Sequence, residues 1–266
     1  MSSSSGEHRV IPSLYSPPLS PATNKGLTRP GIGYAVAEAS LASSARVTIS
    51  SSSHTKVANS LKALQVAFPS LAPGTVRGHV CNLAKATCEN DITILFQVCG
   101  HVDHIVFTAG DPLATVPIAD ATWEKIVQAG QVRFIAPLLV AKIGSKYMTS
   151  SPESSIVLTT GSVSERPIKD WSIVAGYAAG LHGMTRNLAL DLKPIRVNLV
   201  SPGAVDTELW GGMKSEDKEK MFTNIAGKVP TGKVGRREFF FPHEGGGITD
   251  LSSGGCCGGV FVVDEG

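Results

Sequence analysis

The chain alternates short β-branched runs with longer stretches of helical apolar spacing, and this alternation restricts the fold more than any other feature. The runs ARVTIS (45–50), VDHIVFTAG (102–110) and SSIVLTTGS (154–162) indicate buried strands. The stretches GIGYAVAEASLA (31–42) and WEKIVQAGQVRFIAPLLVAKI (123–143) have the apolar period of helices. Because strands that alternate with helices form βαβ units, we predict an α/β fold with a parallel sheet.

Composition excludes several classes of protein. Hydrophobic residues make up 42% and charged residues 17% of the 266 positions, which is inconsistent with wholesale disorder. A net charge of +2 and an aromatic content of 6% argue against a nucleic-acid partner, so the expected partner is a small molecule. No apolar run approaches the roughly 18 residues of a membrane span, and the N-terminus lacks the apolar core of a signal peptide. Five cysteines without zinc spacing indicate free thiols, no metal site and a cytoplasmic location.

The two ends of the chain differ from its middle. Residues 1–25 are rich in serine and proline, and we expect a poorly structured N-terminal segment. Residues 26–266 are expected to form one domain. Within it, the glycine-rich segment 238–259 is poor in helix formers and is predicted to be irregular, before a last strand in VFVVDE.

A glycine-rich turn opens the first clear helix. Gly31, Ile32 and Gly33 precede the helical stretch that starts at Tyr34. Such a turn can hold a pyrophosphate, because free backbone N–H groups and the helix N-terminus face the anion. The pattern G-x-G alone is weak, but here it is followed in order by ARVTIS, TAG after a strand, and SPGAVDT after a later strand.

Together these motifs resemble the short-chain dehydrogenase/reductase family, over roughly residues 26–237 and the final VFVVDEG. The resemblance implies a single Rossmann-type, doubly wound parallel sheet of about seven strands with helices on both faces. It also implies a nicotinamide cofactor, bound by the glycine turn, by an adenine-side pair, by the TAG segment and by the segment after the last long strand. The implied contacts are Gly31, Ile32, Gly33, Asn82, Leu83, Thr108, Ala109, Gly110, Pro202, Gly203, Val205 and Thr207.

The residues after the second predicted strand favour NADP over NAD. NAD selectivity usually needs an acidic side chain there, to accept from the ribose 2′-hydroxyl. This chain has Ser51, Ser52 and Ser53, followed by Lys56, and Arg29 precedes the glycine turn. Hydroxyls and cations suit a 2′-phosphate. The alternative is a solvated serine loop with surface cations.

The family pattern breaks at the first turn. Leu27 stands where the family has another glycine, and its side chain would block close approach of the backbone to a phosphate. The residues just before it, LSPATNK, make a poor strand. Either HRVIPSLY (8–15) supplies the first strand, or the first element of the domain is damaged.

The catalytic positions also depart from the family, which uses Asn, Ser, Tyr and Lys. Alignment on the helix LHGMTRNLALDL places those four residues at Gly130, Gly161, Val174 and Ala178. Tyr177 is a tempting substitute, but the residue four places later is leucine. A positioned general acid is worth roughly 10²–10⁴-fold in carbonyl reduction. An iminium substrate avoids this need, because it is already cationic and becomes a neutral amine on hydride transfer.

The middle of the chain resembles a fungal secondary-metabolite branch of the family that lacks these residues. VRFIAPL, the Asp-Trp pair and GLHGMTRNLALDLKPIRVNLVSPG carry this resemblance. The branch includes the reductase/Diels–Alderases of the malbrancheamide and paraherquamide pathways.

Four side chains are candidates for the substrate pocket. Asp170 is placed to pair with a cationic substrate and Trp171 to cover its apolar face, in the loop after the fifth strand. Arg133 lies one helical turn beyond Gly130, and Tyr177 is a possible displaced proton donor. The alternatives are a solvated or interface cation for Arg133, a helix cap for Asp170, and packing for Trp171 and Tyr177.

Three functions remain open. The first is an atypical NADP-dependent oxidoreductase acting on an imine-like metabolite. The second is a non-redox protein that binds or shapes a metabolite, as a cyclase or pericyclase does. The third is an inactive member of the family. The family resemblance also implies a homodimer or homotetramer formed through the helices at 123–143 and 175–192.

Overall fold

The centre of the protein is a parallel β-sheet with the strand order β3-β2-β1-β4-β5-β6-β7. The computed structural model describes residues 9–13, 31–235 and 260–261. All the strand pairings are parallel, as the βαβ pattern predicts. The strands are β1 (Arg9–Ser13), β2 (Arg46–Ser51), β3 (Val76–Val80), β4 (His104–Phe107), β5 (Ser155–Thr159), β6 (Arg196–Val200) and β7 (Val260–Phe261).

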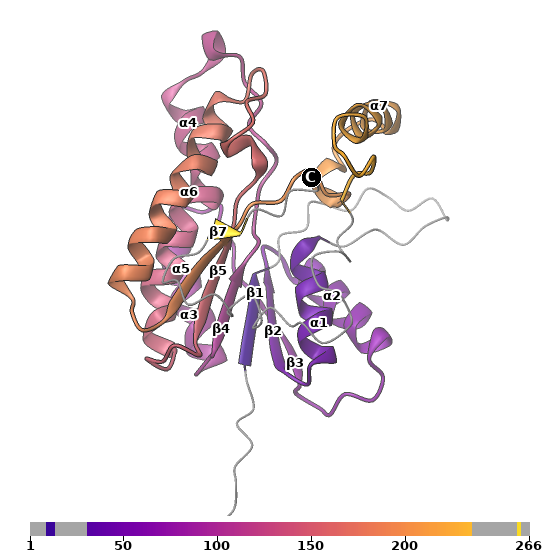
Figure 1. Ribbon diagram of the computed structural model, residues 1–266. Coiled ribbons are helices and arrows are strands. Elements are labelled where there is room, and N and C mark those ends of the chain that lie inside the picture. Colours follow the sequence, from indigo (N-terminus) through magenta and orange to yellow (C-terminus); the bar gives the residue numbers. More distant parts are fainter. Residues whose placement is uncertain (1–8, 14–30, 236–259, 262–266) are drawn as a thin grey trace, which may run out of the picture.

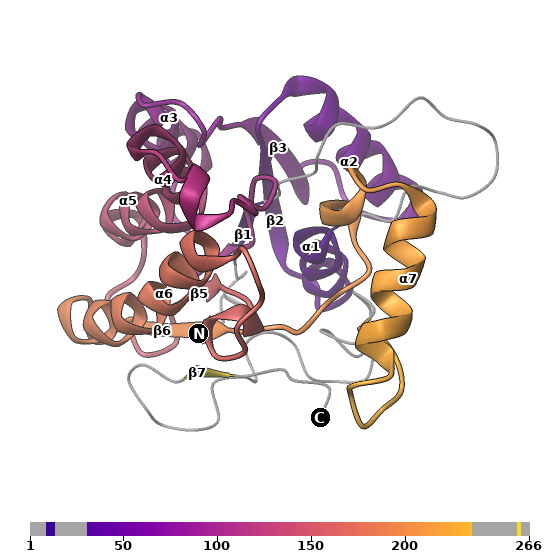
Figure 2. The ribbon, with the colours of Figure 1, turned by 90° about the horizontal axis from the view of Figure 1, so that it is seen from above.

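Helices cover both faces of the sheet (Figure 1). On one face lie α1 (Ile32–Ala42) and α2 (His54–Ala67), and on the other lie α3 (Cys88–Cys99), α4 (Trp123–Gly130), α5 (Ala136–Gly144) and α6 (Ser172–Asp191). The helix α7 (Ser215–Ala226) lies beyond the sheet, on the side of α1 and α2 (Figure 2). The prediction of a Rossmann-type α/β fold is therefore confirmed.

The central strands are apolar on both faces because helices cover both of them. Ile105 and Ile156 pack into the cluster under α3, α5 and α6. Their neighbours Val106 and Val157 point the other way and pack with Val36 of α1. Such two-sided burial accounts for the continuous apolar runs from which these strands were predicted.

The first strand comes from the N-terminal segment. β1 pairs with β2 on one side and β4 on the other, so HRVIPSLY does supply it. Residues 1–25 were expected to lie outside the domain, and this is wrong for Arg9–Ser13. Pro12 conceals the strand in the sequence, because proline lacks the N–H that a central strand donates. Leu27, Arg29 and the segment 238–259 lie outside the described residues.

The long helix predicted at 123–143 is interrupted by a π-helical turn. Gln131–Ile135 forms this turn, which we call the π-turn, between α4 and α5. Within the described residues, the stretch Trp123–Tyr147 is the one helix long and apolar enough to cross a membrane, with a mean hydropathy of 1.4 over an 18-residue window. Of that window, 44% is buried inside the domain, as expected of a core helix.

Three cysteines lie in the described part of the chain. Cys81, Cys88 and Cys99 are buried, and Cys81 and Cys88 are free thiols, as predicted for these two. Burial raises the pKa of the Cys81 thiol to about 12, so it is a packing residue rather than a nucleophile.

Candidate active site

The carboxyl ends of the parallel strands gather the predicted binding segments at one edge of the sheet. The N-terminus of α1 and the segments that follow β2, β3, β4, β5 and β6 all lie there. In sheets of this type the ligand crevice lies outside this edge. Every predicted cofactor residue except Arg29, which lies outside the described residues, belongs to one of these segments.

The N-terminus of α1 has the features of an anion site. Gly31 is the N-cap in extended conformation, and the first turn contains no acidic residue. The Tyr34 N–H donates to the Gly31 carbonyl (3.1 Å). The N–H groups ahead of it in the first turn have no acceptor within the helix, as at any helix N-terminus, and can face an anion. Gly33 is buried. This half of the turn fits a pyrophosphate.

The three serines after β2 have different roles. Ser51 is 5% exposed, and its hydroxyl has no hydrogen-bond partner among the described residues. Ser52 lies next to Lys56, whose Nζ is 3.3 Å from its Oγ. Ser53 caps α2 by accepting from the Lys56 N–H (3.4 Å). A buried hydroxyl without a partner and an adjacent ammonium fit the ribose end of a nucleotide.

The adenine-side loop is tied to the π-turn. The Asn82 side chain accepts from the Ala84 N–H (3.1 Å), which fixes the local turn. Leu83 is buried, and its carbonyl accepts from Nε2 of Gln131 (3.2 Å). The same amide is 3.4 Å from Sγ of Cys88. The sequence analysis missed Gln131, because nothing in its local pattern distinguishes it from a surface residue.

Arg133 of the π-turn forms an ion pair with Asp111, the residue that follows the TAG segment. Its Nε lies 3.0 Å from Oδ1 of Asp111, and both side chains are about three-quarters buried (24% and 22% exposed). The guanidinium also donates to the Asp111 carbonyl. A Cβ at Gly110 would lie 2.9 Å from Nη1 of Arg133, so a side chain there would force the end of the Arg133 side chain to shift. Arg133 is thus not a solvated cation.

Burial raises the pKa of the Asp111 carboxyl, and the Arg133 guanidinium partly offsets this. The sequence analysis missed Asp111. Its position directly after TAG, at the end of β4, was the available signal.

Tyr177 packs against the π-turn. Its hydroxyl donates to the Ile126 carbonyl (3.0 Å), and its ring lies 5.4 Å from the Phe134 ring. A Cβ at Gly130 would lie 2.5 Å from Cζ of Tyr177. The ring therefore fills the space in which a longer side chain at position 130 would lie.

The loop after β5 leads into α6. Asp170 is exposed and has a positive φ of 64°, and its carbonyl accepts from the Val116 N–H (3.0 Å). It does not cap α6, whose N-cap is Trp171. Trp171 is half-buried. The backbone contact joins the loop after β4 to the loop after β5.

The sequence analysis assigned the positions of the family's Ser, Tyr and Lys to Gly161, Val174 and Ala178. A Cβ at Gly161 would meet nothing within 4 Å. Val174 is buried, at 5% exposure. The Ala178 carbonyl accepts from the Thr160 hydroxyl (2.9 Å), which joins the end of β5 to α6.

Comparison with known proteins defines the family. The model of the SDR-like Rossmann domain matches residues 25–258. The chain belongs to the short-chain dehydrogenase/reductase family. It is 42% identical over 214 residues to the short-chain dehydrogenase/reductase fsr5 of Gibberella fujikuroi, covering 78% of this chain and 80% of the relative. It is 38% identical over 213 residues to malC of Malbranchea aurantiaca, with 78% and 80% covered.

Among solved structures, the chain is similar to the MalC reductase/Diels–Alderase of Malbranchea aurantiaca. The TM-score is 0.83 at 32% identity, and 98% of this chain and 96% of that chain are covered. Both relatives are fungal, as is the branch that the middle of the sequence resembles.

In this member of the family, the segment after β6 is tied to the segment that contains α7. The Pro202 carbonyl accepts from the Ser162 N–H (2.9 Å), which holds the ends of β5 and β6 together. The Val205 carbonyl accepts from the indole N–H of Trp210 (2.8 Å), and Val205 forms a bridge with Gly235. Thr207 is buried. The chain segment that contains α7 thus begins and ends beside the predicted nicotinamide segment.

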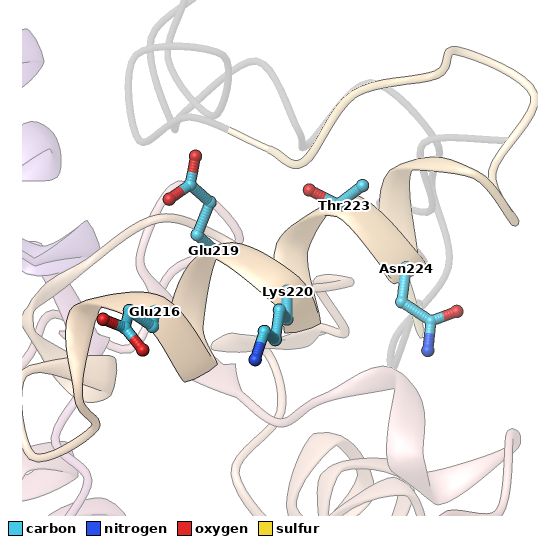
Figure 3. A pocket seen from close by; sticks show the side chains of 5 residues that line it. All are labelled: Glu216, Glu219, Lys220, Thr223 and Asn224. Carbon is cyan, nitrogen blue, oxygen red and sulfur yellow. The ribbon is translucent and has the colours of Figure 1, made fainter.

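A hollow lies on α7. Its described lining residues are Glu216, Glu219, Lys220, Thr223 and Asn224. All belong to one helix, and their side chains leave it in different directions (Figure 3). None is a predicted site residue.

Proposed function

We propose that this chain is an NADP-dependent reductase of a small, cationic, imine-like metabolite. The observation that carries the proposal is the Asp111–Arg133 ion pair, with Nε and Oδ1 3.0 Å apart at the carboxyl edge of the sheet. It combines with the absence of an acid or base from Gly161, Val174 and Ala178. The chain's membership of the short-chain dehydrogenase/reductase family supports the proposal of a nicotinamide cofactor.

An iminium substrate suits such a site because its reduction needs no proton. A bound nicotinamide would supply a hydride to the iminium carbon. The C=N π electrons would become the nitrogen lone pair, so the product would be a neutral amine. A ketone would instead give an alkoxide, which needs a positioned acid worth roughly 10²–10⁴-fold.

The chain's own side chains would bind and orient the cation. The Asp111 carboxylate supplies negative charge, and Arg133 holds it in place from the π-turn. Because both groups are largely removed from water, their fields act more strongly than at the surface. Asp170 and Trp171, in the loop joined to Val116, would cover the open side.

Preference for NADP is supported by the residues after β2. The Ser51 hydroxyl has no partner among the described residues, and Lys56 lies 3.3 Å from Ser52. These groups would donate to a 2′-phosphate, and no carboxylate occurs among Ser51, Ser52 and Ser53 to accept from a 2′-hydroxyl.

The test is a fluorescence titration of NADPH against the purified protein, with NADH as the control, followed by turnover with a cyclic iminium. We expect saturable binding that favours NADPH, and oxidation of NADPH by the iminium. Absence of binding at high micromolar NADPH would refute the proposal that the protein is a reductase.

A second candidate is a non-redox role in which the protein shapes a reactive metabolite. A Cβ at Gly161 would meet nothing within 4 Å, so that position is open, and the similar MalC structure is described as a reductase/Diels–Alderase. Cyclisation of a substrate with no consumption of NADPH would favour this candidate.

A further inference from the structure

We propose that Tyr177 is a positioning residue, which holds the π-turn in the register that brings Arg133 to Asp111. The inference rests on the proposed function, since it concerns the same ion pair. It assigns Tyr177 a role other than the proton donor that the sequence suggested.

The hydroxyl of Tyr177 contacts the chain before Arg133. It donates to the Ile126 carbonyl at 3.0 Å, one helical turn ahead of Gly130. A carbonyl oxygen has two lone pairs, so this bond is compatible with an intrahelical one. The bond fixes the middle of α4 against α6, about one turn before the helix changes from α to π geometry.

The ring of Tyr177 contacts the chain after Arg133. Its centroid lies 5.4 Å from that of Phe134, at an interplanar angle of 43°. Phe134 also lies close to the α6 backbone, because a Cβ at Gly180 would be 2.7 Å from its Cε2. Tyr177 and Gly180 together form the surface of α6 on which the π-turn packs.

Gly130 completes the fit. A Cβ there would approach Cζ, Oη and Cε1 of Tyr177 to 2.5–2.8 Å. The ring of Tyr177 therefore occupies the space that a side chain at position 130 would need, so the two positions are complementary.

The register of the π-turn decides where Arg133 points. A π-turn holds one more residue than an α-turn, and each residue of a helix advances about 100° around the axis. Collapse of the π-turn to regular helix would swing Arg133 by about that angle, away from Asp111. Contacts on both sides of Arg133 oppose this collapse.

The test is Tyr177→Phe, which keeps the ring and removes the hydroxyl. With N-methyl-1-pyrrolinium as the substrate, we expect kcat to fall about tenfold, the order of one lost positioning hydrogen bond. The Kd for NADPH should stay unchanged. Carbon-13 NMR of the Asp111 carboxyl should show its pKa moving further up, because burial raises it and Arg133 is the described charged group that lowers it.

The NMR titration needs no substrate, so it separates failure of this inference from failure of the proposed reaction. Gly130→Ala, which pushes the ring away, should shift the Asp111 titration in the same direction. Gly183→Ala on α6, where a Cβ meets nothing within 4 Å, is the control. If Tyr177→Phe or Gly130→Ala lowers only the melting temperature and leaves the Asp111 titration in place, Tyr177 merely packs and the inference is overturned.

Discussion

The two halves of the carboxyl edge are built in different ways. The half at β1, β2 and β3 presents backbone N–H groups, glycines and short hydroxyl side chains at the starts of α1 and α2. The half at β4, β5 and β6 relies on pairs between distant residues, such as Arg133 with Asp111 and Tyr177 with Ile126. The first half is the nucleotide site that we propose, and local sequence specifies its residues. The second half depends on tertiary packing.

The largest effect is expected when the ion pair of the second half is broken. Arg133→Met leaves Asp111 largely buried without its cation and removes the charge that orients it. We expect kcat/KM for a cyclic iminium to fall about 100-fold, in the range of one lost preorganised electrostatic group. The Kd for NADPH should hardly change, because the first half is intact.

The control for this variant is Arg186→Met, at an exposed position on α6. It should retain full activity. If Arg133→Met weakened NADPH binding as much as it slowed turnover, the two halves would not be independent and the comparison would fail.

Adding the family's tyrosine should destabilise the second half. Val174 is 5% exposed, and a tyrosine there overpacks the core, so we expect Val174→Tyr to lower the free energy of unfolding by about 1–3 kcal/mol. Gly161→Ser should change it by less than about 0.5 kcal/mol, because a Cβ at Gly161 meets nothing within 4 Å.

Urea denaturation measures both variants. If Val174→Tyr left the free energy of unfolding unchanged, the core would still have space for the family's tyrosine. This half of the edge would then differ less from the family pattern than its contacts indicate.

A smaller effect is expected from a single cation in the first half. Lys56→Met removes the ammonium beside Ser52, and we expect the Kd for NADPH to rise about tenfold while that for NADH stays the same. Fluorescence titration of both cofactors tests this, with the exposed Lys62→Met on α2 as the matched control. An equal loss for both cofactors would show that Lys56 does not select the 2′-phosphate.

Sequence reasoning succeeded where structure is local. The apolar periods predicted α1, the strands β4 and β5, and the long helix that begins at Trp123, because each pattern reports burial by its neighbours. The resemblance of the glycine turn to the family pattern also led to the right family. β1 was left open because Pro12 obscures its strand pattern.

The second half resisted prediction for a physical reason. Asp111 and Arg133 are 22 positions apart, and Tyr177 is 51 positions from Ile126. No local period encodes such pairs. The π-turn was hidden as well, since QVRFI reads as ordinary helix. Arg133 was chosen from its spacing to Gly130, but its partner became visible only in the folded chain.

The most direct test of the central claim compares two substrates of one ring size. NADPH oxidation is followed with N-methyl-1-pyrrolinium and with cyclopentanone, in the native protein and in Asp111→Asn. The account predicts a kcat/KM for the iminium about 100-fold or more above that for the ketone, and loss of this advantage in Asp111→Asn. Equal rates for the two substrates, or an unchanged advantage in Asp111→Asn, would contradict it.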